Sequence, residues 1–206
     1  MAFTDYASFQ AAIANWLNRA DLSAAIPDFI RQAEATCNKV LRTRYMIAET
    51  TVSIGSGADR VALPADLIDV LYVVNNAAAA ETLVKQVPDW MARQQRLRLK
   101  TAGTPLYYSV IGGNLLVCPV PAAGKVYKLS YYQEIPALSD GNTSNWLLAH
   151  HPDIYLYTAL MHAAPYMADD ARSELFGQSI VKMVQSLIAN NQTTTLEGQD
   201  YNEFKG

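Results

Sequence analysis

Residues 127–172, YKLSYYQEIPALSDGNTSNWLLAHHPDIYLYTALMHAAPYMADDAR, contain the transition that decides the fold. The stretch opens inside a run from Lys125 to Gln133 that has strand character and ends at a turn around Pro136. From Trp146 onward the pattern is helical, and Pro152 stands where a helix begins. The chain therefore passes here from a β-rich region to a helical one.

Beyond this stretch the sequence predicts one more helix and a tail. Asp169 and Asp170 can cap a helix with one apolar stripe, which consists of Leu175, Phe176, Ile180, Met183, Val184, Leu187 and Ile188. Apolar residues become scarce after Asn190. We therefore expect residues 192–206 to form an extended tail that depends on a partner for its order.

The N-terminal region predicts two amphipathic helices joined by a short turn. The first runs from Thr4, its expected cap, to Arg19, and its apolar face consists of Tyr6, Phe9, Ile13, Trp16, Leu17 and Ala20. The second begins at about Pro27 and has a stripe of its own, which consists of Phe29, Ile30, Ala33, Cys37, Val40 and Leu41. Two such helices with a short connection are expected to pack as a hairpin.

The region between the two helical parts has the alternation of strands. Strand signals cover Thr50 to Ile54, Leu67 to Val74, Leu106 to Ile111 and Leu115 to Val120. Gly112, Gly113 and Asn114 lie between the last two runs and predict a hairpin turn. A short helix is expected between Gln86 and Leu99.

These elements predict an α+β fold with an insertion. Residues 1–46 and 145–191 are expected to form a helical bundle, and residues 47–144 a β-rich module with a short helix, inserted between them. Residues 192–206 form the tail. Strands and helices do not alternate along the chain, which argues against a doubly wound nucleotide-binding sheet.

Composition limits the classes of function. The 206 residues are 50% hydrophobic and only 17% charged, so part of the surface is expected to be covered by a partner. A net charge of −3 gives no reason to expect nucleic acid as the primary ligand. Cys37 and Cys118 could form a disulfide, but we expect two buried thiols, as in a reducing cytoplasm. Neither a secretory signal nor a run of ~20 apolar residues is found, so a soluble protein is expected.

The sequence gives no sign of catalytic chemistry. The glycines lack the spacing of a P-loop or a dinucleotide fingerprint, and no nucleophile elbow occurs. His150 and His151 are adjacent, so helical geometry would point them about 100° apart and away from one shared metal ion. His162 is expected to pack in an apolar helix. We therefore expect no enzyme activity, no cofactor and no metal.

One cluster of charge could contact a partner. Arg93, Arg96, Arg98 and Lys100 lie on the expected short helix and at its end. They could bind phosphate or an acidic protein surface, or they could simply form a solvated helix face. The chain also has 12 tyrosines, which suit interfaces and half-buried sheets equally well.

Four segments together resemble the head-to-tail adaptor proteins of tailed bacteriophages, a group similar to tail tubular protein A. They are residues 6–44, VALPADLIDVLYV (61–73), GTPLYYSVIGGNLLVCPVP (103–121) and residues 127–172. The last is the most specific, with a strand, an Ile-Pro-x-Leu-Ser turn, Asn-Trp-Leu and a helix opened by His-Pro-Asp. The similarity extends from about Thr4 to about Ile188.

The resemblance implies a structural virion protein at the head–tail junction, made in the bacterial cytoplasm. It implies a ring of twelve copies beneath the portal protein, which joins the portal to the tail and continues the DNA channel. The implied partners are the portal, neighbouring copies, the next tail or neck protein and passing DNA. The resemblance also implies that the C-terminal segment docks on the portal, and its candidate contact residues are Gln192, Thr193, Thr194, Thr195, Leu196, Tyr201 and Phe204.

The sequence is also compatible with two other functions. The first is a small-ligand or carbohydrate-binding module that uses the tyrosines of the β-rich part as a stacking platform. The second is a nucleic-acid-binding accessory protein that uses the cluster from Arg93 to Lys100.

Overall fold

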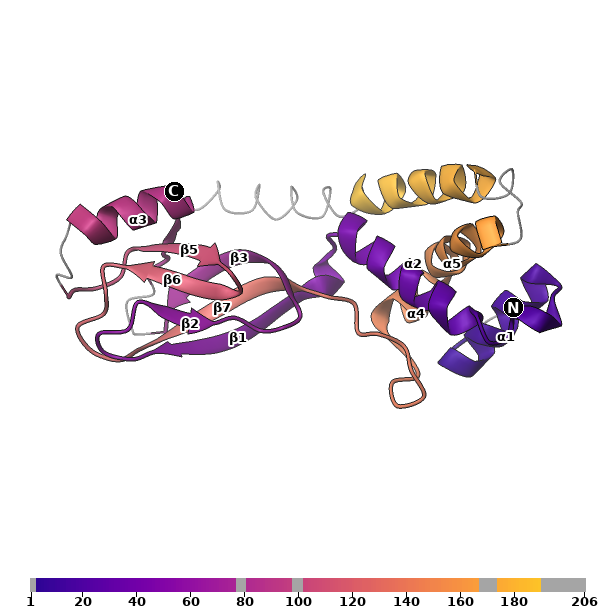
Figure 1. Cartoon of the computed structure of the whole chain (residues 1–206), viewed down its shortest axis with the longest axis horizontal. Coiled ribbons are helices and arrows are strands. Elements are labelled where there is room, and N and C mark those ends of the chain that lie inside the picture. Colours follow the sequence, from indigo (N-terminus) through magenta and orange to yellow (C-terminus); the bar gives the residue numbers. More distant parts are fainter. Residues whose placement is uncertain (1–2, 77–80, 98–101, 167–173, 190–206) are drawn as a thin grey trace, which may run out of the picture. The chain divides into compact units, whose positions relative to one another are not determined.

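The computed structural model describes residues 3–76, 81–97, 102–166 and 174–189. The chain divides into two compact units, which are shown in Figure 1. The helical unit consists of Met1–Tyr45 and Ile135–Gly206, and the β unit is the segment Met46–Glu134. Strands occur in the β unit and helices mainly in the helical unit, which confirms the predicted α+β class.

The helical unit contains helices from both ends of the chain. Its α-helices are α1 (Tyr6–Leu17), α2 (Ile26–Val40), α4 (Trp146–His150) and α5 (Pro152–Tyr166). Residues 174–189 form a further helix, and the 3₁₀ turns η1 (Ala20–Leu22) and η2 (Arg44–Met46) lie in the connections.

The cap of α1 differs from the expected one. Asp5, and not Thr4, caps the helix: its carboxylate accepts a hydrogen bond from the Ser8 backbone N–H at 2.8 Å. The Ser8 hydroxyl in turn accepts one from the Asp5 N–H at 3.2 Å. This reciprocal arrangement satisfies two donors at the helix start, whereas the Thr4 side chain would stand one residue too early.

Helices α1, α2 and α5 pack around one apolar core. Phe9 of α1 contacts Tyr155 of α5, with ring centroids 4.7 Å apart. Other buried side chains come from these three helices and from α4, and they include Ile13, Ile26, Ile30, Ala33, Leu147, Ala159 and Leu160. Three residues of the apolar stripes are instead half exposed or more, namely Trp16 (50%), Val40 (51%) and Leu175 (65%). In the helix 174–189, Val184 is the one buried side chain.

A buried carboxylate attaches α2 to the segment that follows the β unit. Glu34 lies among the apolar residues of α2 and is 5% exposed. Its Oε1 accepts hydrogen bonds from the Leu138 backbone N–H (2.7 Å) and the Tyr155 hydroxyl (2.5 Å). Burial raises the pKa of the Glu34 carboxyl, and the two hydrogen bonds act in the opposite direction.

Two asparagines extend this attachment. Asn38 Oδ1 accepts a hydrogen bond from the Ile135 N–H at 2.8 Å, and Asn145 Nδ2 donates one to the Pro136 carbonyl at 2.8 Å. Asn145 also caps α4. Residues 135–144, which the sequence analysis assigned to the inserted module, therefore lie in the helical unit. The backbone groups of this segment that belong to no strand or helix bond to side chains of α2 and to Asn145, the cap of α4.

The β unit is a sandwich of two sheets. β1 (Ile47–Ile54), β7 (Lys125–Gln133) and β3 (Leu67–Asn75) form an antiparallel sheet in the order β1-β7-β3. The second sheet has the order β2-β6-β5-β4 and consists of β2 (Arg60–Ala62), β6 (Asn114–Cys118), β5 (Tyr107–Ile111) and β4 (Val84–Lys85). β4 is parallel to β5. The inner faces share a core that includes Val52, Val73, Tyr108, Val117 and Leu129.

The outer face of the second sheet is covered by α3 (Pro88–Leu97). Met91 of α3 is fully buried against Leu116 and Cys118 of β6. The Trp90 ring contacts Tyr107 of β5 edge-on, with centroids 4.8 Å apart. Because β5 and β6 are buried on both faces, they have the almost continuous apolar character seen in the sequence.

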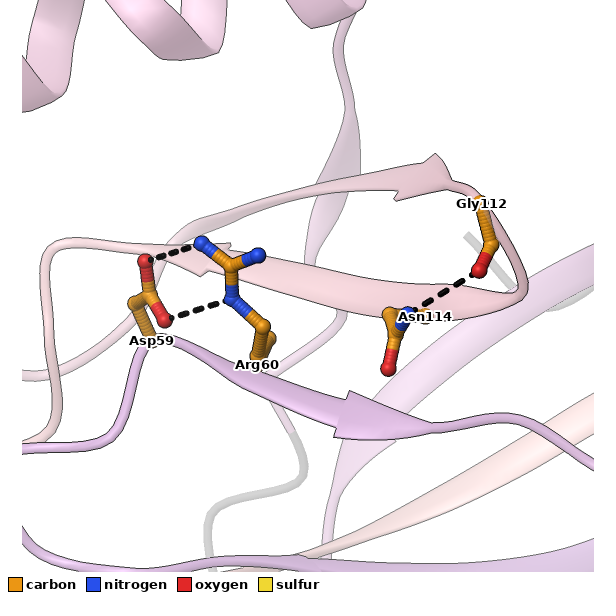
Figure 2. Close-up of polar contacts among 4 residues, drawn as sticks. All are labelled: Asp59, Arg60, Gly112 and Asn114. Carbon is orange, nitrogen blue, oxygen red and sulfur yellow. Dashed lines mark hydrogen bonds and ion pairs between the residues drawn. The ribbon is translucent and has the colours of Figure 1, made fainter.

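The predicted hairpin connects β5 and β6. Gly112 and Gly113 have φ of 55° and 74°, a left-handed backbone that glycine adopts readily and that suits a two-residue hairpin turn. Figure 2 shows the Asn114 side-chain amide donating to the Gly112 carbonyl at 3.0 Å. This double glycine therefore marks the turn that the sequence predicted.

The burial of the last helix is tested by one pair of substitutions. Val184→Asp places an unpaired charge at a position that is 7% exposed, and we expect it to destabilise the fold by several kcal/mol. Lys182→Asp changes an exposed side chain of the same helix and should melt like the wild type. Circular dichroism melts measure both, and equal melting of the two variants would refute the assignment of Val184 to the core.

The role of Glu34 is tested by its amide and its apolar analogue. Glu34→Gln keeps an oxygen that can accept from Leu138 and Tyr155 and removes the ionisation. Because burial raises the pKa of the folded carboxyl, the stability due to protonated Glu34 is complete below its ordinary pKa and is lost as pH rises. The free energy of unfolding of Glu34→Gln should therefore increase relative to that of the wild type as the pH rises through the pKa of Glu34 in the folded protein.

Glu34→Leu serves as the contrast. It leaves two buried donors without an acceptor, which costs about 1–3 kcal/mol for each. Urea unfolding at several pH values checks both variants. A Gln variant as unstable as the Leu variant would show that the two hydrogen bonds do not stabilise the fold.

Candidate partner-binding surfaces

The candidate docking residues of the tail lie outside the described part of the chain. They are Gln192, Thr193, Thr194, Thr195, Leu196, Tyr201 and Phe204. Arg98 and Lys100 of the cationic cluster also fall outside it. The structure therefore describes only Arg93 and Arg96 of the residues that the sequence singled out for partner contact.

Arg93 and Arg96 lie on exposed positions of α3. Arg93 forms an ion pair with Asp89, one helical turn earlier, at 2.9 Å, and both side chains are about three-quarters exposed. Ion pairs of this kind contribute at most a few tenths of a kcal/mol to a helix. The apolar face of α3 holds the helix on β6 through Met91, so the arginines remain on the solvent side. They are available to an acidic or phosphate-bearing partner.

Three of the six tyrosines of the β unit are part of its core. Tyr108, Tyr127 and Tyr131 are 2%, 0% and 6% exposed. Burial raises the pKa of Tyr127 to about 12. Tyr72 is exposed, but its hydroxyl donates to the Glu49 carboxylate at 3.0 Å. Tyr108, Tyr127 and Tyr131 face the sandwich interior, so these three rings cannot form a stacking platform for a ligand.

The histidines have structural partners. The exposed His150 ring stacks on Tyr45, with centroids 4.6 Å apart, and the Trp146 ring stacks on the same tyrosine at 5.6 Å. His162 Nε2 lies 2.9 Å from the Thr36 hydroxyl, so a hydrogen bond joins α5 to α2. Burial lowers the pKa of His151 and of His162. Within the described ranges, no group of three His, Cys, Asp or Glu residues is placed to hold a metal ion.

The two cysteines are buried thiols and form no disulfide with each other. Burial raises the pKa of Cys37 to about 11, so its reactive thiolate is scarce at neutral pH. None of the helices in the described residues is both long and apolar enough to span a bilayer.

A second kind of surface, which the sequence analysis missed, lies at the edges of the β sandwich. Exposed aliphatic side chains occur on β1 (Ile47, 45%), on β4 (Val84, 53%) and beside β4 (Val87, 64%; Leu106, 47%). Single exposed aliphatic residues are common, but these stand at strands with an unpaired side. The sequence placed the first strand at Thr50 to Ile54 and predicted no strand at residues 84–85, and the sheet order that leaves these residues at edges has no local signal.

Comparison with known proteins identifies the family of the chain. No curated protein matches the chain. The family model described as SU10 adaptor protein matches residues 4–199, which is nearly the whole chain and includes both units. This match confirms the resemblance to phage head-to-tail adaptors. The chain therefore belongs to the SU10 adaptor family of bacteriophage adaptor proteins.

Proposed function

We propose that this protein is a non-catalytic structural subunit that joins the portal to the tail of a bacteriophage virion. In this proposal twelve copies form a ring beneath the portal and continue the DNA channel. The observation that carries the proposal is the family match over residues 4–199. The number twelve follows from the resemblance to neck adaptors.

The described surface is consistent with a protein that is covered by partners. Only 17% of the residues are charged, and exposed aliphatic side chains occur on both units, including Val40 and Leu175 on the helical unit. Such a surface is expected where neighbouring copies and other virion proteins cover it. Catalysis is not required for this role, and the buried Cys37 thiol and the hydrogen-bonded His162 have structural explanations.

Contact with the genome in this proposal is transient and independent of sequence. A chain with a net charge of −3 lacks the basic surface of a dedicated DNA-binding protein. Arg93 and Arg96 on the solvent side of α3 would meet an acidic partner surface or passing phosphates. The protein would be made in the host cytoplasm and function in the virion.

The C-terminal segment is proposed to dock on the portal. Its candidate contact residues are Gln192 to Leu196, Tyr201 and Phe204. The segment is polar, with three consecutive threonines and few aliphatic residues, so it cannot form a core by itself. An extended segment of this kind gains order from contacts along the partner.

Assembly on the portal tests the function directly. Portal rings of the same phage are mixed with saturating protein and viewed by electron microscopy. We expect a layer of density below the portal with one copy per portal subunit, because the adaptor uses the portal as its template. Portal rings that remain bare at saturation would refute the proposal.

Removal of residues 192–206 tests the docking segment. We expect the truncated protein to melt within about 1 °C of the full chain, since the segment has few aliphatic residues to contribute to a core. Attachment to portal rings should fall at least tenfold in a co-sedimentation assay. A variant with the same 15 residues in scrambled order is the matched control, and full attachment by either variant would contradict a docking role.

A further inference from the structure

Strand β1 (Ile47–Ile54) has one side without a partner strand. In the described sheet its only neighbour is β7, and β1 lies along the lower margin of the β unit in Figure 1. The two strands pair over eight consecutive residues without a register shift, whereas β3 pairs with β7 through two shifts. β1 contains no proline and no lysine, which are residues that commonly protect an edge. It is therefore a regular and unprotected edge.

Alternation along the strands shows which backbone groups of β1 are open. The Asn76 N–H donates to the Val126 carbonyl, so the backbone of Val126 faces β3 and that of its neighbour Tyr127 faces β1. Tyr127 pairs with Val52, so the backbone groups of Val52 point to β7. Alternate residues of β1 point the other way, and these residues are Ile47, Glu49, Thr51 and Ser53. Within the described ranges, no other backbone group bonds to them on that side.

The other edges of the sandwich are bonded or short. On β3 the Val73 carbonyl accepts from the Leu83 N–H, in the segment before β4, at 2.8 Å. After β4 the Val87 carbonyl accepts from the Met91 N–H of α3 at 3.2 Å. β2 has only three residues and carries the ion pair of Arg60 that Figure 2 shows, and both properties discourage strand addition. β1 is therefore the longest open edge among the described strands.

Short side chains line the outer face of β1 where longer ones stand behind them on β7. Val52 belongs to the sandwich core, so the alternate residues of β1 point to the outer face of the sheet. Thr51 lies beside Lys128 on that face, and Ser53 lies beside Val126. A side chain that arrives from beyond the edge can therefore pass over Thr51 or Ser53 and reach the side chain behind it.

We propose that two copies of the protein pair through their β1 strands, in antiparallel orientation, about a two-fold axis at Thr50. In this register Glu49 lies opposite the partner's Thr51, and Ile47 lies opposite the partner's Ser53. All of these residues have outward-facing backbone groups, so the two edges form a ladder of hydrogen bonds. The two three-stranded sheets become one sheet with the order β3-β7-β1-β1-β7-β3.

The charges on the outer face are complementary in this register. Within one copy the Lys128 ammonium lies 2.6 Å from the Glu49 carboxylate, and both side chains are nearly half exposed. Across the axis, Glu49 extends over the partner's Thr51 toward the partner's Lys128, two strands or about 10 Å away between backbones. The two carboxylates are diagonal neighbours and lie between the two ammonium groups. The contact therefore joins two exposed ion pairs into one cluster of alternating charge.

The exposed aliphatic side chains match in the same register. Ile47 is 45% exposed and Val126 is 42% exposed. Ile47 lies opposite the partner's Ser53, and the partner's Val126 stands behind that serine, so the two aliphatic side chains cover the serine from both sides. A shift of two residues in one direction places Glu49 opposite the partner's Glu49. A shift in the other direction leaves Ile47 opposite the partner's Gly55, beyond the end of β1.

This contact goes beyond the adaptor function and does not depend on it. A contact that uses the same surface of both copies is isologous and ends with a dimer. Neighbours in a closed ring are related by a head-to-tail operation, so they use other surfaces. The β1 pair is therefore a property of the free protein. It closes an edge that would otherwise be open to any exposed strand.

Cysteine substitutions on β1 test the pairing and its register. Thr50 lies opposite the partner's Thr50 in a non-hydrogen-bonded pair, where Cα atoms are about 4.5 Å apart and a disulfide is possible. We expect Thr50→Cys to give a disulfide-linked dimer under mild oxidation. Ser53→Cys is the matched control, because its own copies are about 20 Å apart in this register. It should link only when mixed with Ile47→Cys on a chain with a different tag. The native Cys37 and Cys118 are buried and should not compete.

Charge exchange separates the contact between copies from the ion pair within one copy. Glu49→Lys and Lys128→Glu each break the internal pair and bring like charges together at the dimer contact. Each variant alone should dimerise about tenfold more weakly than the wild type, as measured by light scattering. The two variants mixed should form a heterodimer as tight as the wild-type dimer, because their charges match only between copies. Circular dichroism melts confirm that both variants are folded.

The outcomes decide between this dimer and other uses of the edge. Light scattering of the wild type from about 10 μM to 1 mM should show the mass rise from monomer to dimer. A mass that stays at the monomer refutes the contact and leaves the adaptor function, which is tested on portal rings, unaffected. A mass that grows beyond the dimer shows head-to-tail strand addition and refutes the two-fold axis. Ser53→Cys that links alone as fast as Thr50→Cys refutes the register, and a charge-exchange mixture that stays monomeric refutes the contact between Glu49 and the partner's Lys128.

Discussion

The helical unit depends on the acceptor that Glu34 supplies inside its core. The chain leaves this unit at Tyr45 and re-enters it at Ile135, so two distant pieces have to be joined. In the re-entering segment the Leu138 N–H belongs to no strand or helix, and an unpaired buried N–H is costly. Glu34 accepts from Leu138 in that segment and from Tyr155 in α5. One side chain of α2 thereby fixes both the return of the chain and the helix that follows.

Local periodicity predicted the elements well where one face is buried by neighbours. β7 has the predicted bounds, Lys125–Gln133, and the β5–β6 hairpin turns at its double glycine. An apolar stripe, however, shows which side of a helix is apolar and does not show how much of that side the rest of the protein covers. Trp16 lies on such a stripe and is half exposed. Glu34 was missed for the complementary reason: its partners lie more than a hundred residues away and leave no trace in a short window.

The partner surfaces were less predictable than the fold. The cluster of positive charges in the sequence made Arg93 and Arg96 candidates for partner contact, and both lie on the solvent side of α3. The open edges could not be found in this way, because whether a strand lies at an edge depends on the order of the whole sheet. β1 pairs with the last strand, β7, and not with the strand that follows it in sequence. Only the assembled sheet leaves Thr51 and its neighbours at an open edge.

The insertion also sets the order in which the units can fold during synthesis. Glu34 precedes Leu138 by 104 residues and Tyr155 by 121, so the N-terminal helices leave the ribosome long before their partners exist. All strands of the β unit, by contrast, lie within one continuous segment, which is complete by Glu134. The sandwich can therefore form before α5 has been synthesised, when the apolar faces of α1 and α2 that pack on α5 are still uncovered. Until α5 emerges, the nascent chain presents the helix hairpin, rather than the sheets, to chaperones.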